Sequence, residues 1–328
     1  GIETYVAPRK HTDKEPGKDK ANYHLILLAM NNTGYENLMR LSTIANLEGF
    51  YYKPRIDREL LEKYNEGLIV LSGCIGGELG DAVRQGQIEK AKEIAMWYKN
   101  IFSDRYYIEL QDHGNPNHPS AWSEQVAANK QLMIIASELS IECVITNDAH
   151  YSVHDDQEAH EVLLCVQTGS FLDEESRMSL RDFELHMADP VDIIERWKDI
   201  LPQAVYNTKL IADRCTVTLE LGRILIPKFP LPEGVTEKSY LEQSVYKGLA
   251  VRYAEKLQEE SNLISIDELK KILSKEVLDR AQFELQIINQ MGFNGYFLII
   301  ADFMNWGKDS GIVFGPGRGS AAGSIIAY

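Results

Sequence analysis

Short apolar runs that alternate with amphipathic patterns constrain the fold of the first two thirds of this chain. The apolar runs predict β-strands, and they lie at residues 24–30, 67–73, 105–110, 132–136 and 143–148. Apolar residues at helical spacing separate these runs, at residues 35–47, 88–102, 119–130 and 155–166. Buried strands that alternate with helices are typical of a parallel sheet or a β/α barrel, so we predict an α/β fold.

The composition is that of a globular protein with an acidic N-terminal part. The chain has 328 residues, 44% of them hydrophobic, and no run of eighteen apolar residues, so we predict no transmembrane helix. Residues 221–328 hold 12 Lys and Arg against 13 Asp and Glu, so the first 220 residues carry −14 of the net charge of −15. Such an acidic region is a poor general nucleic-acid binder but suits a metal site. Four cysteines without paired spacing favour a reducing, cytoplasmic compartment.

The C-terminal third has a different pattern, which predicts a second domain. Pro227, Pro230 and Pro232 interrupt the chain after a predicted helix at 207–215, and we place the domain boundary there. Beyond this passage, helices are predicted at 239–257, 266–291 and 296–308, with a turn at 292–295 and a short strand at 311–314. Near the other end of the chain, five basic residues between Arg9 and Lys20 predict a solvated loop.

Residue types that bind metals recur at the predicted strands. In α/β sheets the chemistry gathers at the C-terminal ends of the strands, and Cys74, His113 and Asp148 follow or end such runs. The candidates are Glu3, His24, Cys74, His113, Asp148 and His150. His24 opens its run, which is the opposite end from the one that the rule requires. Each residue alone has an ordinary structural role, such as a turn or a small buried side chain.

Together, these six residues from five strands predict a metal centre. A mixture of thiol, imidazole and carboxylate ligands suits Zn²⁺ or Mn²⁺, and grouped metals with a bound water favour phosphoester hydrolysis. The remaining histidines fit no such scheme, and they are His11, His118, His154, His160 and His186.

The last fourteen residues, GPGRGSAAGSIIAY, read as a tight glycine loop that enters a helix. Glycines permit backbone angles that side chains forbid, and Ser320 stands at an N-cap or first-turn position. Free N–H groups at such a turn suit phosphate oxygens, and Arg318 adds forked donors. A bare glycine-rich turn is more often only a turn, and this one is not a Walker loop because no Gly-Lys-Ser/Thr follows.

Several motifs in order resemble one family over essentially the whole chain. The segments NQMGFNGYF at 289–297 and GPGRGSAAGSIIAY at 315–328 resemble the start of the palm of bacterial replicative DNA polymerase III alpha subunits, the family C polymerases. Upstream, NNTGYENL at 31–38, EGLIVLSGC at 66–74 and TNDAHY at 146–151 resemble the PHP domain of the same family. The resemblance implies a PHP-type distorted β/α barrel over residues 1–225. A helical connection and the start of a nucleotidyltransferase-like palm follow over residues 226–328.

The resemblance also implies the roles of individual residues. Gly317, Arg318, Gly319 and Ser320 fall where the family binds the triphosphate of the incoming deoxynucleotide. The PHP metal positions fall on Glu3, His24, Cys74, His113, Asp148 and His150. Mg²⁺ is the implied metal for polymerisation, and Zn²⁺ or Mn²⁺ is the implied metal of the PHP site.

The implied function is template-directed DNA synthesis from dNTPs, with a PHP domain that acts as a 3′–5′ exonuclease where its site is intact. The implied partners are primer-template DNA, the sliding clamp and the proofreading exonuclease subunit, in the cytoplasm and without a membrane. The family's His-x-His motif and palm aspartates do not occur in this sequence, and no initiator Met opens it. We therefore expect a truncated chain that is inactive alone. Two alternatives remain: a free-standing PHP phosphoesterase, and a decayed PHP domain that serves as a docking platform.

Overall fold

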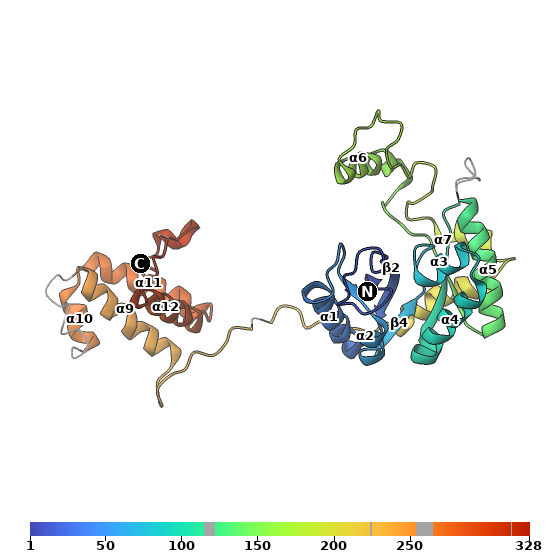
Figure 1. Cartoon of the computed structure of the whole chain (residues 1–328). Helices are drawn as coiled ribbons and strands as arrows, with labels where there is room; N and C mark the ends of the chain where they lie inside the picture. The colour runs from blue at the N-terminus through green and yellow to red at the C-terminus, as the bar shows by residue number, and fades with distance from the viewer. Residues whose placement is uncertain (115–121, 224, 254–264, 316) are drawn as a thin grey trace. The chain divides into compact units, whose positions relative to one another are not determined.

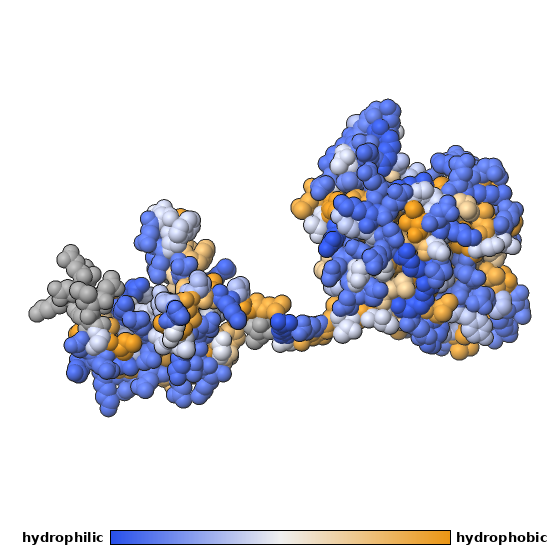
Figure 2. All heavy atoms as spheres, turned by 90° about the horizontal axis from the view of Figure 1, so that it is seen from below, coloured by the Kyte–Doolittle hydropathy of each residue, from blue (hydrophilic) through white to orange (hydrophobic). Residues whose placement is uncertain are grey.

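The computed structural model describes residues 1–114, 122–223, 225–253, 265–315 and 317–328. Over these residues the chain forms two compact units, Gly1–Leu219 and Glu220–Tyr328 (Figure 1). The predicted helix start at residue 119 and the predicted helix end at residue 257 lie outside the described residues. No helix in the described ranges is long and apolar enough to cross a membrane. The face seen in Figure 2 is mainly hydrophilic, with apolar residues in scattered patches.

The first unit is built on a sheet that confirms the predicted α/β class. Its strands within the described residues are β1 (Ile2–Val6), β2 (Tyr23–Ala29), β3 (Arg55–Ile56), β4 (Leu68–Leu71), β5 (Tyr106–Gln111) and β6 (Cys143–Thr146). Their order is β3-β1-β2-β4-β5-β6. Strand β2 runs antiparallel to both of its neighbours, and the other adjacent pairs are parallel. The N-terminal end of β2 therefore lies at the same edge as the C-terminal ends of the other strands.

Helices cover both faces of this sheet. The helices of this unit within the described residues are α1 (Asn32–Leu47), α2 (Arg58–Lys63), α3 (Glu78–Arg84), α4 (Ile88–Phe102), α5 (Ser123–Leu139), α6 (Gln157–Thr168), α7 (Pro190–Trp197) and α8 (Pro202–Arg214). Of these, α6 projects away from the sheet (Figure 1). The side chains of β4 are buried on both faces of the sheet. Leu68 and Val70 pack into the larger core on one face. On the other face, Ile69 and Leu71 pack with Ile211 of α8. A strand that is buried on both faces reads as a continuous apolar run, as the sequence of β4 does.

The strand predicted at residues 132–136 is wrong, because this segment lies inside helix α5. Leu132, Ile135 and Ala136 are buried, while Ile134 is 50% exposed. Buried positions at this spacing lie on one side of a helix, and Ala128 extends the same side one turn earlier. A short apolar run cannot be assigned to strand or helix from its own residues alone, and here the flanking helical sequence decides.

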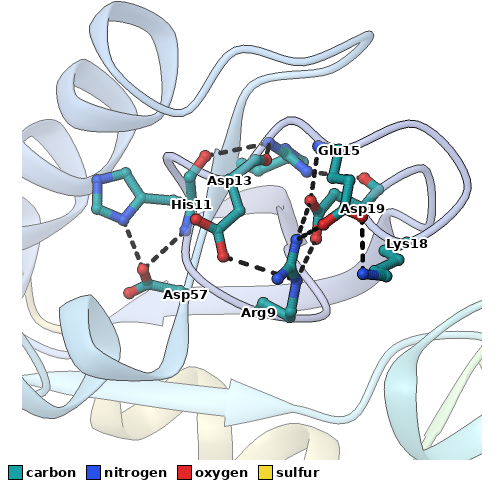
Figure 3. A network of polar contacts seen from close by, with 8 residues as sticks. Arg9, His11, Asp13, Glu15, Lys18, Asp19 and Asp57 are labelled. Carbon is teal, nitrogen blue, oxygen red and sulfur yellow. Dashed lines mark hydrogen bonds and ion pairs between the residues drawn. The ribbon is translucent and has the colours of Figure 1, made fainter.

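The basic segment near the N-terminus is a loop whose five basic residues are exposed, as predicted, and contacts also hold it to the protein body. The Arg9 guanidinium contacts the Asp19 carboxylate through two hydrogen bonds, of 2.8 and 2.6 Å (Figure 3). Hydrogen bonding to Arg9 lowers the pKa of Asp19 to about 2. Arg55 of β3 is 0% exposed, and its guanidinium donates to the backbone carbonyls of His11 and Asp13 within this segment. Contacts from Asp19 and from the buried Arg55 thus hold the backbone of a loop whose basic side chains face solvent.

The second unit is helical in the described residues. It contains α9 (Glu237–Tyr253), α10 (Ile266–Ile272), α11 (Lys275–Gln290), α12 (Asn294–Asp309) and the short 3-10 helix η3 (Gly319–Gly323). The single helix predicted over 266–291 is wrong, because Leu273 is extended and the Ser274 side chain caps α11 by accepting the Val277 N–H. The predicted strand at 311–314 does not form in the part of the chain described.

Candidate functional site

Glu3, His24 and Cys74 meet at one edge of the sheet. The register of β1 and β2 places Glu3 diagonally across from His24 on the same face. The Nδ1 atom of His24 lies 2.8 Å from Glu3 Oε1 and 3.6 Å from Cys74 Sγ. Gly73 makes this approach sterically feasible, because it has a φ of +78° and a Cβ there would lie 2.6 Å from the His24 carbonyl oxygen. The antiparallel direction of β2 explains how His24 reaches this edge from the start of its strand.

His113 and Asp148 form a second contact, with His113 Nε2 3.3 Å from Asp148 Oδ2. Asp148 follows β6 and has a φ of +51°, and its carbonyl oxygen lies 2.7 Å from His150 Nδ1. An N–H on Nδ1 donates to this carbonyl and leaves Nε2 of His150 as the free ring nitrogen. The neighbouring Asp112 is buried and turned elsewhere, where it accepts hydrogen bonds from Arg196 and from the Trp197 ring.

Electrostatics joins these two groups of side chains into one neighbourhood. Burial raises the pKa of the Cys74 thiol, and the negative charges of Asp148, Glu109 and Glu3 raise it further. Burial also opposes ionisation of Asp148, but contact with His113 and the nearby imidazoles of His150 and His24 lowers its pKa overall. All six predicted residues therefore lie close enough to contact or influence another member of the set.

Glu109 is a further carboxylate at this edge, and our reading of the sequence missed it. It lies on β5, is 4% exposed, and accepts hydrogen bonds from the Gly73 N–H and the Thr146 hydroxyl, at 3.1 and 2.6 Å. Burial raises its pKa. The signal for it was present, because a charged residue inside the apolar run at 105–110 is seldom buried without a partner.

The donor types at the edge fit a metal ion, since imidazole, thiolate and carboxylate are the ligands of zinc and related metals. His113 Nε2 is buried, and the partner described for it is Asp148 Oδ2 at 3.3 Å. However, the donors form two separate sets of contacts, one around His24 and one at Asp148. No group of three or more such side chains among the described residues is placed to hold a metal ion. The metal role of the six residues therefore stays a prediction.

The glycine loop stands clear of the rest of the second unit. Gly317 and Gly319 have φ values of +81° and +62°, in the region that favours glycine. A Cβ at either position, or at Gly315 or Gly323, would meet no described atom within 4 Å. The helix predicted after the loop is present only as the 3-10 helix η3, and Ser320 lies in its first turn. Residue 316 lies outside the described part of the chain, and residues 317–320 are exposed.

Comparisons with known proteins agree with this arrangement of two units. The PHP domain model matches residues 1–113, and the model of the bacterial DNA polymerase III alpha NTPase domain matches residues 239–328. The chain is 37% identical to the DNA polymerase III subunit alpha of Thermus aquaticus and 38% identical to that of Borreliella burgdorferi, over its whole length in both cases. It spans 30% and 27% of these relatives.

The subunit alpha of Treponema pallidum is 39% identical over the whole chain, which spans 26% of that relative. Both family models occur in the order that the sequence motifs imply, one in each compact unit. The chain therefore belongs to the family of bacterial DNA polymerase III alpha subunits.

Proposed function

We propose that this chain is part of the catalytic alpha subunit of a bacterial replicative DNA polymerase, which synthesises DNA from dNTPs on a primed template. The observation that carries the proposal is the exposed glycine loop within the segment that matches the polymerase NTPase domain. We assign residues 1–225 to the PHP domain and residues 226–328 to the start of the palm. The contact boundary between the two units, after Leu219, lies close to this division.

The loop has the chemistry to bind the triphosphate of an incoming nucleotide. Left-handed glycines at 317 and 319 turn the backbone so that its N–H groups are free of side-chain cover. Arg318 presents forked donors beside them, and Ser320 adds a hydroxyl. Mg²⁺, when bound, would neutralise phosphate charge and activate the primer 3′-hydroxyl. The loop residues themselves would bind and orient the phosphates.

Substitution of the loop tests this proposal in the complete polymerase. We expect Arg318→Ala and Ser320→Ala each to raise the KM for dNTPs by roughly tenfold, because each removes a hydrogen bond to a charged phosphate. Primer extension at varied dNTP concentration measures the effect. Ser310→Ala is the matched control, because Ser310 is exposed and lies outside the loop. An unchanged KM in both loop variants would remove the triphosphate assignment.

We further propose that the edge of the sheet in the first unit is the PHP metal centre. Its ligands would be Glu3, His24, Cys74, His113, Asp148 and His150, with Zn²⁺ or Mn²⁺ as the metal. The support is the gathering of these donors, with Glu3 beside His24 and the buried Nε2 of His113 beside Asp148. Bound metal would activate a water for phosphoester hydrolysis at a DNA 3′ end. Glu109 places a further carboxylate beside these donors, where it accepts from the Gly73 N–H and the Thr146 hydroxyl.

Metal analysis of the complete polymerase tests this second proposal. We expect stoichiometric bound metal in the unaltered protein and a loss of most of it in Asp148→Asn and His150→Ala, because each removes one ligand. His154→Ala is the control, since the His154 side chain is 66% exposed and lies outside the donor set. A metal-free unaltered protein would instead favour the docking-platform alternative.

We propose primer-template DNA, dNTPs, the sliding clamp and the proofreading exonuclease subunit as partners, and the cytoplasm as the compartment. The support is membership of the polymerase family. A free-standing phosphoesterase leaves the second unit unexplained, because that unit matches the polymerase NTPase domain.

A further inference from the structure

The exposed glycine loop is fastened at both of its ends. On its N-terminal side, the Phe314 ring packs against Gly307 of α12, where a Cβ would lie 2.3 Å from the ring. The same ring meets Phe303 edge-on, with 5.8 Å between the ring centroids. On its C-terminal side, Ile325 and Ile326 pack against the core of the second unit. The described loop residues 317–323 thus lie between two attached segments, one at Phe314 and one at Ile325 and Ile326.

A carboxylate on a helix provides the polar part of the C-terminal attachment. Glu284 lies on α11 and is 8% exposed. Its Oε2 accepts a hydrogen bond of 2.7 Å from the Ser324 hydroxyl and one of 3.2 Å from the Ile326 N–H. Its Oε1 accepts a hydrogen bond of 2.6 Å from Arg280. Both oxygens are therefore engaged, one by the end of the loop and one by a cation on the same helix.

The charge on Glu284 strengthens this attachment. Burial disfavours ionisation, but Ser324, the Ile326 N–H and Arg280 together lower the pKa of Glu284 below its ordinary value. Hydrogen bonds to an ionised acceptor are shorter and stronger than those between neutral groups. The Arg280 guanidinium also compensates the negative charge, so that an anionic ligand at the loop would meet less repulsion from this carboxylate.

A fixed loop binds a ligand more tightly than a free one. Ordering a loop opposes binding, so a loop that is already held in its bound conformation has a higher affinity for the same contacts. The segment that follows the loop is held further by Tyr328, whose ring lies 4.1 Å from the Arg252 guanidinium carbon. The attachments leave Arg318 and Ser320 exposed, which are the residues that would contact phosphate.

We propose that Glu284 is a positioning residue for nucleotide binding, which holds the C-terminal end of the loop so that residues 317–320 meet the triphosphate. This inference rests on the proposed nucleotide-binding function of the loop. Glu284 acts through Ser324 and the backbone of Ile326, and it does not touch the ligand itself.

Two measurements on the complete polymerase test the inference. Trypsin cleavage after Arg318 reports the mobility of the loop, and we expect Glu284→Ala to accelerate it at least fivefold relative to the unaltered protein. Primer extension reports nucleotide binding, and we expect Glu284→Ala to raise the dNTP KM by roughly tenfold while kcat falls less than about threefold. Partial unfolding alone would lower kcat and leave KM unchanged, so the split distinguishes positioning from general destabilisation.

Matched variants sharpen the test. Glu284→Gln keeps a carbonyl acceptor of the same shape, so we expect it to restore most of the affinity that alanine loses. Glu276→Ala is the control on the same helix, because Glu276 is exposed. Ser324→Ala removes the partner hydroxyl, and we expect its effect to be less than additive with Glu284→Ala, since the two residues share one hydrogen bond.

The outcomes separate this inference from the function on which it rests. Unchanged cleavage after Arg318 in Glu284→Ala would overturn the attachment itself. Faster cleavage with an unchanged KM would overturn the positioning role if Ser320→Ala still raises KM. If the dNTP KM is unchanged in Ser320→Ala as well as in Glu284→Ala, the result would instead contradict the proposed triphosphate function of the loop. Faster cleavage, a raised KM and rescue by glutamine together support the inference.

Discussion

Replacing Arg55 by methionine is expected to lower the free energy of unfolding of the first unit by about 3–5 kcal/mol. The guanidinium is fully buried and donates to four backbone carbonyls, those of Gly49, His11, Asp13 and Asp19. Methionine fills part of the volume but leaves these buried acceptors without their donor. Chemical denaturation of the complete protein, followed by a signal from the first unit, measures the loss.

The control for this prediction is Arg40→Met on helix α1. The Arg40 side chain is 61% exposed and makes only a long contact of 4.0 Å with Glu36, so we expect its replacement to change stability by less than about 0.5 kcal/mol. Hydrogen exchange should also rise in residues 9–19 of Arg55→Met, because Arg55 holds that segment. If Arg55→Met lowers the free energy of unfolding as little as Arg40→Met does, the prediction is contradicted, because water then replaces the Arg55 guanidinium without cost.

Replacing Asp112 by alanine is expected to lower the free energy of unfolding by about 2–4 kcal/mol. The carboxylate is 1% exposed and binds three donors, the Gly114 N–H, Arg196 Nε and Trp197 Nε1. Alanine leaves the buried indole N–H and the guanidinium of α7 without an acceptor. Thermal or denaturant unfolding measures the loss, and Asp155→Ala at an exposed position is the control.

The same substitution bears on the candidate metal centre, because His113 is the next residue. Asp112→Asn keeps one acceptor oxygen, so we expect it to lose roughly half as much stability as alanine. If Asp112 also fixes the backbone that presents His113, Asp112→Ala should lower the metal affinity more than Asp112→Asn does, in parallel with its larger loss of stability. Equal stability of Asp112→Ala and Asp155→Ala would contradict the role of this carboxylate.

The sequence was sufficient to predict the α/β class and most strands, because a strand that is buried on both faces is a continuous apolar run. Strand direction was not predictable in this way. His24 stood at the wrong end of its strand under the assumption of a parallel sheet, and only the antiparallel course of β2 brings it to Glu3 and Cys74. Local periodicity carries no information about which neighbour a strand will pair with.

Local sequence patterns also could not predict the role of a residue whose partner lies far away along the chain. No local pattern singles out Arg55, yet it donates to the backbone of a loop some forty positions earlier in the chain. No local pattern singles out Glu284 on its helix, although it binds the segment after the glycine loop. At Ser274, in contrast, a cap signal was present, but the apolar pattern continued through it and a single helix was predicted. Tertiary contacts decide such cases.

The most direct test of the account is the affinity of the complete polymerase for a dNTP at the glycine loop. Equilibrium binding of a nonincorporable dNTP analogue to the polymerase on a primed template measures this affinity without the chemical step. We predict that Arg318→Ala and Ser320→Ala each weaken binding by roughly tenfold, and that Ser310→Ala leaves it unchanged. Equal affinity of the loop variants and the control would contradict the claim that this loop holds the triphosphate.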